Sequence, residues 1–216
     1  MRIIDLSATI SHGMTVYPGD PGVNLELKDS FPEDVCQVTM LHFGSHTATH
    51  VDAPRHFLPE GTVLNAVPLD AFVGPAIAFR VRLDETTEDG HPIITLSKEQ
   101  MDRIEIQDRV IFSTGWEEHT ATEQYFQKYP VFSEDLLAFL ASKSPRLIGA
   151  DLPTLASVSD PFLMHRLLFH KQTVFAEGLV GLAPLCEKRF FFSAAPLKLE
   201  GGDGSPVRAY AVLDED

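Results

Sequence analysis

A short segment of the chain, HTATHVDAPRHF at residues 46–57, carries many side chains that bind metal ions or move protons. His46, His50, Asp52 and His56 fall within eleven residues, in a chain that has nine histidines in all. Neutral imidazole and carboxylate are common protein ligands of Zn²⁺, Mn²⁺ and Fe²⁺. Histidine also exchanges protons near neutral pH, because its unperturbed pKa is about 6.5. The segment therefore indicates a metal site, a proton-transfer site, or both.

The backbone of this segment must bend if its first two histidines are to bind one ion. Threonine and valine alternate with the polar residues and favour an extended chain, and Pro54 opposes a helix. On a straight strand His46 and His50 would lie about 13 Å apart at ~3.3 Å per residue, whereas a metal–nitrogen bond is only about 2.0–2.1 Å long. We therefore expect a bend or bulge at Ala48, with Asp52 completing the ligand set.

Three other residues are less well determined by the sequence alone. His56 lies beyond a proline that redirects the chain, which suits a proton carrier near the metal rather than a ligand. His165 and Glu177 are twelve positions apart, and a partly buried histidine on a helix with a carboxylate at a strand end would explain them equally well. Spacing alone does not decide whether this pair joins the site.

Extended segments outnumber helices along the chain, which predicts a mixed α/β fold with a partly closed β-sheet or barrel, formed by residues 1–216 as a single domain. Helices are expected after a capping box at Ser97–Gln100, after Ser133, and over 161–171 with Pro161 in the first turn. The tail is expected to form two strands joined by a glycine-rich loop. We expect the other strands at 2–7, 23–29, 36–43, 76–83, 109–116, 146–153 and 173–179.

Composition and charge limit the classes of function. A chain of 216 residues with 44% hydrophobic and 22% charged residues suits a soluble globular protein, and no apolar run approaches the ~20 residues of a membrane span. The net charge of −14 argues against a nucleic-acid partner. The opening residues do not read as a signal peptide, and Cys36 and Cys186 are expected to be two buried thiols without a disulfide. We therefore expect a cytoplasmic protein.

Segment 46–57 resembles the H-x-G-T-H-x-D-x-P-x-H-F signature of the cyclase family, which includes bacterial kynurenine formamidases and isatin hydrolases. Ala48 stands where the signature has glycine. The resemblance extends over nearly the whole chain and implies a cyclase-like, swivelling β/β/α fold. Further segments that resemble the family, in the same order, are 5–21, 113–116, 148–154, 159–168, 175–179 and 200–212.

The family resemblance implies a site with two divalent metal ions, zinc in the first instance and manganese as the alternative. His46, His50 and Asp52 would bind the first ion. Asp52 would bridge to a second ion, which His165 and Glu177 would hold. The resemblance also implies a homodimer or higher homo-oligomer that acts on a small-molecule substrate.

The chemistry implied by the resemblance is hydrolysis by a metal-activated hydroxide, with His56 as the general acid/base. N-formylkynurenine, cleaved to formate and kynurenine, is the first candidate substrate, and an isatin-like imide or a lactone is the alternative. Tyr17 stands where kynurenine formamidases tend to carry tryptophan. Together with Phe43 and Trp116 it is a candidate wall for an aromatic substrate, although each could equally be a core residue.

Two other classes of protein explain fewer of these residues. A non-haem iron oxygenase built on His50, Asp52 and His165 leaves Glu177 and two histidines without a role, and activity without oxygen would reject it. A catalytically degenerate binding protein is the third alternative, although every polar residue of the expected site is present.

Overall fold

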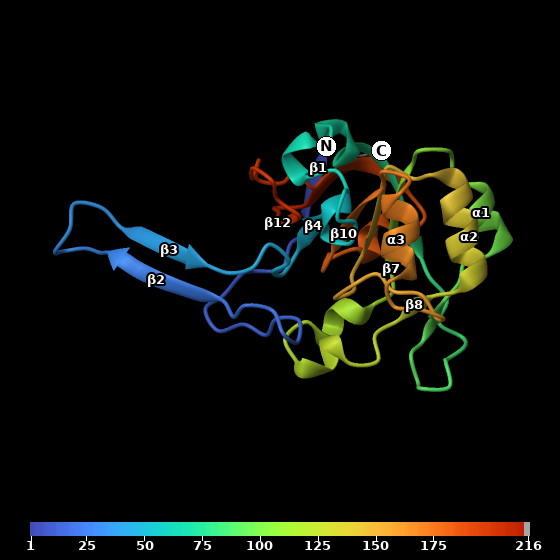
Figure 1. The fold of residues 1–216 in the computed structure, drawn as a ribbon, viewed down its shortest axis with the longest axis horizontal. Helices are drawn as coiled ribbons and strands as arrows, with labels where there is room; N and C mark the ends of the chain where they lie inside the picture. Colours follow the sequence, from blue (N-terminus) through green and yellow to red (C-terminus); the bar gives the residue numbers. More distant parts are fainter. Residues whose placement is uncertain (214–216) are drawn as a thin grey trace.

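The structure, a computed structural model, describes residues 1–213, and they form a mixed α/β fold around one nine-stranded sheet. The strand order is β1-β13-β11-β5-β7-β9-β10-β4-β12, so the sheet keeps two edges and curls without closing into a barrel. Figure 1 shows the α-helices gathered on one side of it. Its strands are β1 (Arg2–Asp5), β4 (His50–Asp52), β5 (Val73–Arg80), β7 (Arg109–Ser113), β9 (Leu147–Ala150), β10 (Val174–Glu177), β11 (Arg189–Ser193), β12 (Gly204–Pro206) and β13 (Tyr210–Leu213).

The four central strands, β5, β7, β9 and β10, run parallel, and antiparallel strands flank them on both sides. Because both faces of this core are covered, consecutive residues alternate between two apolar clusters. In β5, Ile77 and Phe79 belong to one cluster, and Ala76 and Ala78 to the other. Parallel strands also bring their carboxyl ends to one edge, which is where β10 ends in Glu177.

The helices confirm two of the three expected starts. Ser97 and Gln100 form the capping box of α1 (Lys98–Asp102), and the Ser133 hydroxyl accepts a hydrogen bond from the Leu136 amide in α2 (Glu134–Lys143). The expected start at Pro161 is wrong, because Asp160 and Phe162 form a turn first and α3 spans Leu163–Phe169. The short 3-10 helices are η1 (Pro54–His56), η2 (Leu64–Ala66), η3 (Leu69–Ala71), η4 (Trp116–His119), η5 (Glu123–Phe126) and η6 (Ala183–Leu185).

The carboxyl-terminal tail differs from the expected pair of strands. Its glycine-rich segment contributes a third strand, β12, which pairs antiparallel with β4 so that Gly204 lies opposite Asp52. Glycine permits this close approach, because a Cβ at position 204 would lie 2.5 Å from Cε1 of His46 and 2.8 Å from the carbonyl oxygen of Val51. The tail therefore lies directly against the histidine-rich segment.

Two strands near the amino terminus form an arm that extends away from the rest of the molecule, as Figure 1 shows. They are β2 (Asn24–Asp29) and β3 (Val38–His42), and within the described part of the chain they pair only with each other. Apolar side chains on the arm are exposed, among them Leu27, Val35 and Leu41 at 54%, 97% and 61%. A second small sheet pairs β6 (Ile93–Ile94) with β8 (Val131–Phe132).

The expectations for the cysteines and for membrane spans have mixed outcomes. Cys36 and Cys186 are free thiols, as expected, but Cys36 is exposed and Cys186 is only half-buried, so the prediction that both are buried is wrong. Cys36 is exposed because it lies on the arm, between β2 and β3.

Over residues 1–213, every helix is too short or too polar to cross a membrane.

Candidate metal centre

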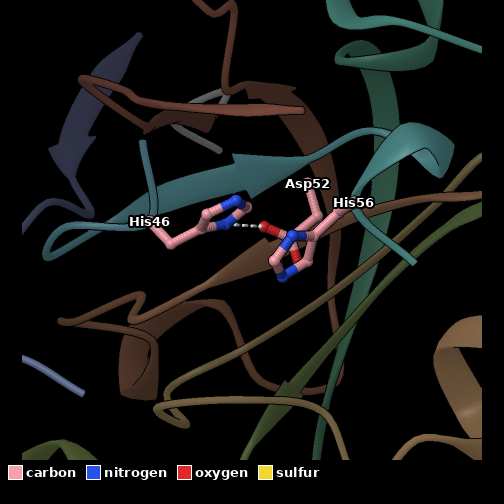
Figure 2. A group of neighbouring side chains, drawn as sticks. All are labelled: His46, Asp52 and His56. Atoms are coloured by element: carbon pink, nitrogen blue, oxygen red, sulfur yellow. Dashed lines mark hydrogen bonds and ion pairs between the residues drawn. The ribbon is translucent and has the colours of Figure 1, made fainter. Parts of the chain in front are cut away.

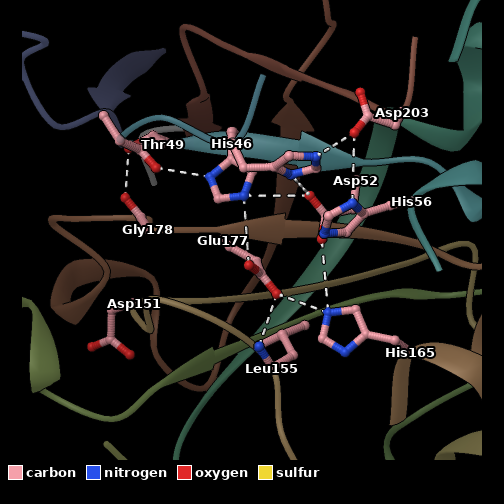
Figure 3. Close-up of polar contacts among 12 residues, drawn as sticks. His46, Thr49, Asp52, His56, Asp151, Leu155, His165, Glu177, Gly178 and Asp203 are labelled. Carbon is pink, nitrogen blue, oxygen red and sulfur yellow. Dashed lines mark hydrogen bonds and ion pairs between the residues drawn. The ribbon is translucent and has the colours of Figure 1, made fainter. Parts of the chain in front are cut away.

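Six polar residues from three segments of the chain, 46–56, α3 and β10, meet at the carboxyl end of β10. His46 precedes β4, His50 and Asp52 lie on β4, and His56 closes η1. The remaining two residues, in α3 and at the end of β10, are His165 and Glu177. Antiparallel pairing of β10 with β4 places Glu177 opposite His50, which explains how residues more than a hundred positions apart come together. Figure 3 shows the resulting cluster of imidazoles and carboxylates.

The bend expected at Ala48 is confirmed. Its φ is +55°, in the left-handed region that residues other than glycine rarely adopt. The bend turns the Ala48 carbonyl so that it accepts a hydrogen bond from Nδ1 of His50 at 2.9 Å. It also brings the rings of His46 and His50 to 5.1 Å between centroids. Gly178 accommodates the bend, because a Cβ there would lie 2.6 Å from the Ala48 oxygen.

Ligand atoms converge in two sets that share Asp52. His50, Asp52 and Glu177 offer one atom each, and these atoms lie within 4.8 Å of one another. His46, Asp52 and His56 form the second set under the same limit (Figure 2). Within them, Nδ1 of His46 lies 2.8 Å from Oδ1 of Asp52, and Nε2 of His50 lies 3.3 Å from the same oxygen. Asp52 is therefore the centre of the cluster.

His165 approaches the cluster from the side of α3. Its Nε2 lies 3.5 Å from Oε1 of Glu177 and 3.8 Å from Oδ2 of Asp52. The ring packs against Phe57 and Phe175 at centroid distances of 4.3 and 5.0 Å, which fixes its direction. The division of ligands between two ions that the family resemblance implies stays a prediction. In this structure Glu177 lies equally close to two imidazoles, 3.5 Å from Nε2 of His50 and 3.5 Å from Nε2 of His165.

The donor set fits a divalent cation. Nε2 of His50 and Oδ2 of Asp52 are buried and have no hydrogen-bond partner among residues 1–213, although buried polar atoms are nearly always paired. Both atoms belong to groups that bind Zn²⁺ or Mn²⁺ through nitrogen and oxygen. Two buried carboxylates with several imidazoles around them therefore form a site in which a cation would satisfy atoms that the chain itself leaves unpaired.

Opposite charges dominate the electrostatics of the cluster. Burial disfavours the charged imidazolium, yet Asp52 raises the pKa of His46 to about 9. Asp52 and Glu177 together raise the pKa of His50 to about 10 against the same burial. In turn, the imidazoles hold the pKa of Asp52 well below its usual range, and His165 and His50 lower the pKa of Glu177, although burial opposes both shifts. The two carboxylates therefore remain charged and require a positive partner.

A comparison of the sequence with known protein families identifies the family to which the chain belongs. The sequence model of the family described as "Putative cyclase" matches residues 4–157, more than half of the chain. The chain belongs to this family. A kynurenine formamidase of Salinibacter ruber is 32% identical over 212 residues, which cover 97% of this chain and 96% of that protein.

Solved structures of the family agree with the fold. A structure described as a "predicted metal-dependent hydrolase" from Bacillus stearothermophilus superposes with a TM-score of 0.77 at 28% identity, over 97% of each chain. An isatin hydrolase bound to the product analogue thioisatinate gives a TM-score of 0.85 at 20% identity, over 99% of this chain and 92% of the other. With these relatives, the chain is a hydrolase of the cyclase family.

Membership of a family with hydrolase relatives argues against an iron oxygenase, and the presence of all six polar residues in one cluster argues against a degenerate binding protein. The triad of an oxygenase would leave out Glu177, yet Oε2 of Glu177 lies 3.5 Å from Nε2 of His50. Its Oε1 also accepts a hydrogen bond from the Leu155 amide at 2.8 Å, so the carboxylate is held in place. Glu177 is thus an integral part of the cluster.

Of the three expected substrate walls, Tyr17 lines the cleft above the cluster. This cleft is bounded by His46, His50, His56, Phe57, Phe162 and Glu177, among others. Tyr17 also lines an adjoining cavity, where its ring meets Phe126 edge to face at 5.8 Å. Phe43 and Trp116 are half-buried and are not among the residues that line these two cavities. Trp116 supports the second cavity indirectly, since its indole N–H donates to the carbonyl of Tyr125, a lining residue.

Two aspartates near the site had no role in the sequence analysis. Asp203, in the glycine-rich tail, lies with Oδ2 3.0 Å from Nε2 of His46. Asp151 is fully buried after β9 and accepts hydrogen bonds from the amides of Thr114 and Gly115. Burial raises the pKa of the Asp151 carboxyl, and these donors oppose the shift. Asp151 thus joins two segments that the family resemblance had singled out. Asp203 also lies in such a segment, 200–212, but the sequence there indicated a glycine-rich loop and no role for its carboxylate.

Replacing Ala48 by glycine should stabilise the protein. The left-handed conformation costs a residue other than glycine about 1–2 kcal/mol, and part of this gain is lost to the greater freedom of glycine in the unfolded chain. We expect the free energy of unfolding in urea to rise by about 0.5–1 kcal/mol. In the control, Ala141→Gly in α2, it should fall by about 1 kcal/mol. A loss of stability in Ala48→Gly equal to that in Ala141→Gly would show that the bend is unstrained.

Proposed function

We propose that the chain hydrolyses a carbon–nitrogen bond of a small molecule, and that N-formylkynurenine is its substrate. The observation that carries this proposal is the cluster itself, in which two buried carboxylates and several imidazoles lie at the floor of a cleft with aromatic walls. The similarity to the kynurenine formamidase of Salinibacter ruber over nearly the whole chain supports the choice of substrate.

The proposed cofactors are two divalent ions, zinc first and manganese as the alternative. His46, His50 and Asp52 would hold one of them. Asp52, His165 and Glu177 would hold the other. When bound, such ions lower the pKa of water and polarise a carbonyl oxygen.

His56 is the residue that we assign to proton transfer. It lines the cleft, and its ring stacks on that of His46 at 3.8 Å between centroids, so it is adjacent to the cluster and reachable by a substrate. A histidine in this position can take a proton from the attacking water and return it to the departing amine. The amine then leaves as a neutral group, which completes the hydrolysis of an amide.

The walls of the cleft favour a flat, apolar group beside the scissile bond. Tyr17, Phe57 and Phe162 contribute aromatic surface, and aromatic rings pack against one another at offset or edge-to-face geometry. An aryl formamide meets this requirement. An isatin-like imide or a lactone meets it too, and the fold shared with isatin hydrolase keeps that substrate as the second candidate.

An assay of the purified chain with N-formylkynurenine and added Zn²⁺ or Mn²⁺ tests the proposal. We expect formation of kynurenine, and in His56→Ala we expect kcat to fall by about 10²–10⁴-fold with a smaller change in KM. His170→Ala, which changes an exposed histidine at the end of α3, should retain the activity of the unchanged protein.

Each arm of this assay has a contrary result. No turnover of N-formylkynurenine with metal present would reject this substrate, and turnover of isatin in its place would establish the alternative. Full activity in His56→Ala would reject the assignment of proton transfer to His56.

We propose further that a second copy of the chain covers the arm formed by β2 and β3, giving a homodimer or a higher homo-oligomer. Leu25 pairs with Leu41 across the arm, and Leu27 follows on the same face, so these leucines form an apolar strip that the chain itself leaves exposed in part.

Light scattering should give a multiple of 23.9 kDa for the unchanged protein and 23.9 kDa for Leu27→Asp with Leu41→Asp. Ile106→Asp, at an exposed apolar residue outside the arm, should leave the mass of the assembly unchanged. A monomeric unchanged protein would refute the proposal.

The cytoplasm is the proposed compartment, since both thiols are free.

A further inference from the structure

Asp203 lies between the two histidines that carry different roles in the proposed function. Its Oδ2 is 3.0 Å from Nε2 of His46 and 3.6 Å from Nδ1 of His56 (Figure 3). The first distance is that of a hydrogen bond, and the second is that of an ion pair without a direct bond. One carboxylate oxygen therefore faces an expected metal ligand and the expected proton carrier at once.

The position of Asp203 is built into the backbone. Its carbonyl oxygen accepts a hydrogen bond from the amide of Ala53 at 2.8 Å, and its Oδ1 accepts one from the hydroxyl of Ser45 at 3.1 Å. The next residue, Gly204, begins β12 and packs against the ring of His46, where a Cβ would lie 2.5 Å from Cε1. The carboxylate is thus held from three directions while its side chain remains 43% exposed.

A carboxylate at this position selects one tautomer of His46. An ionised carboxylate only accepts hydrogen bonds, so in the neutral imidazole that can bind a metal ion Nε2 of His46 is the nitrogen that carries the proton. Nδ1, the nitrogen that faces Asp52 at 2.8 Å, is then the one free to bind a cation. Histidine ligands of metal ions commonly donate their other ring N–H to a carboxylate in this way, which fixes the ring and increases its basicity.

The same oxygen orients His56. The rings of His46 and His56 are stacked, with 3.8 Å between centroids and 24° between planes, so a shift of one ring displaces the other. Because Nδ1 of His56 faces Asp203, Nε2 of His56 is the nitrogen that can exchange a proton with the substrate.

We propose that Asp203 is a positioning residue that sets the tautomer of His46 for metal binding and aligns His56 for proton transfer. This inference rests on the proposed function, and it adds a contact that couples the metal site to the proton carrier.

The test compares Asp203→Asn with Asp203→Glu and with Glu200→Gln, which removes a charge from an exposed residue of the same segment. Zn²⁺ affinity is measured calorimetrically on each metal-free protein, without substrate. We expect Asp203→Asn to weaken Zn²⁺ binding by about 10–100-fold, because an amide can also donate and no longer imposes one tautomer. Asp203→Glu should recover part of this affinity, and Glu200→Gln should bind Zn²⁺ as the unchanged protein does.

Kinetics give the second readout. With a substrate that the unchanged protein hydrolyses, Asp203→Asn should lower kcat at saturating metal and leave KM nearly unchanged, since His56 rather than substrate binding is affected. If no substrate is found, the calorimetric comparison still decides the role of Asp203, so failure of the proposed function is distinguishable from failure of this inference.

Three results would overturn the inference. The first is a Zn²⁺ affinity of Asp203→Asn equal to that of Glu200→Gln. The second is a lower unfolding midpoint in metal-free Asp203→Asn with unchanged affinity in its folded fraction, which would indicate a purely structural role. The third is an unchanged protein that binds neither Zn²⁺ nor Mn²⁺.

Discussion

The charge of two buried carboxylates is the constraint on which the rest of the site depends. Asp52 and Glu177 are both almost completely buried. Transfer of a charged carboxylate from water into the protein interior costs free energy unless a positive charge compensates it, and here two carboxylates are buried together. Imidazoles from the segment before β4, from β4 itself and from α3 surround them at 2.8–3.8 Å. In a chain similar to a protein described as a metal-dependent hydrolase, this arrangement of nitrogen and oxygen donors fits divalent cations.

Backbone geometry brings these donors together at a local cost. The antiparallel pairing of β4 with β10 sets Glu177 opposite His50, and the pairing of β4 with β12 brings the tail against His46. Between the first two histidines the chain turns through Ala48 in a left-handed conformation. Strained residues of this kind cluster at functional sites, where the surrounding structure holds them. Gly178 lies directly against the carbonyl of Ala48, and Gly204 packs against the ring of His46 two residues earlier.

The sequence allowed prediction of what local chemistry determines. Residue types and spacing in 46–57 predicted both the cluster and the bend, since a straight strand cannot bring His46 and His50 together. The caps of α1 and α2 were predictable for the same reason, because they are formed by neighbouring side chains. The place of His165 and Glu177 came only from the family resemblance, because their approach depends on strand pairing over long distances.

What could not be predicted depends on tertiary contacts. A glycine-rich segment has the composition of a loop, so nothing local indicated that Gly204 would pair with β4 and bring Asp203 to the site. Trp116 and Tyr17 are both aromatic residues beside glycine or proline, yet packing places only Tyr17 in the cleft. The thiol of Cys36 is exposed because the residue lies on the arm. No short sequence pattern indicates that the arm extends away from the molecule.

Metal binding by the purified, metal-free chain tests the central claim most directly. Titration with Zn²⁺ or Mn²⁺ should show binding of up to two ions per chain, together with a rise in the thermal unfolding midpoint, because a ligand bound only by the folded state stabilises it. Asp52→Asn should lose most of this binding, since Asp52 belongs to both sets of ligand atoms. A folded chain that binds neither ion, and that hydrolyses its substrate equally well in the presence of a chelator, would contradict the claim that the buried carboxylates form a metal centre.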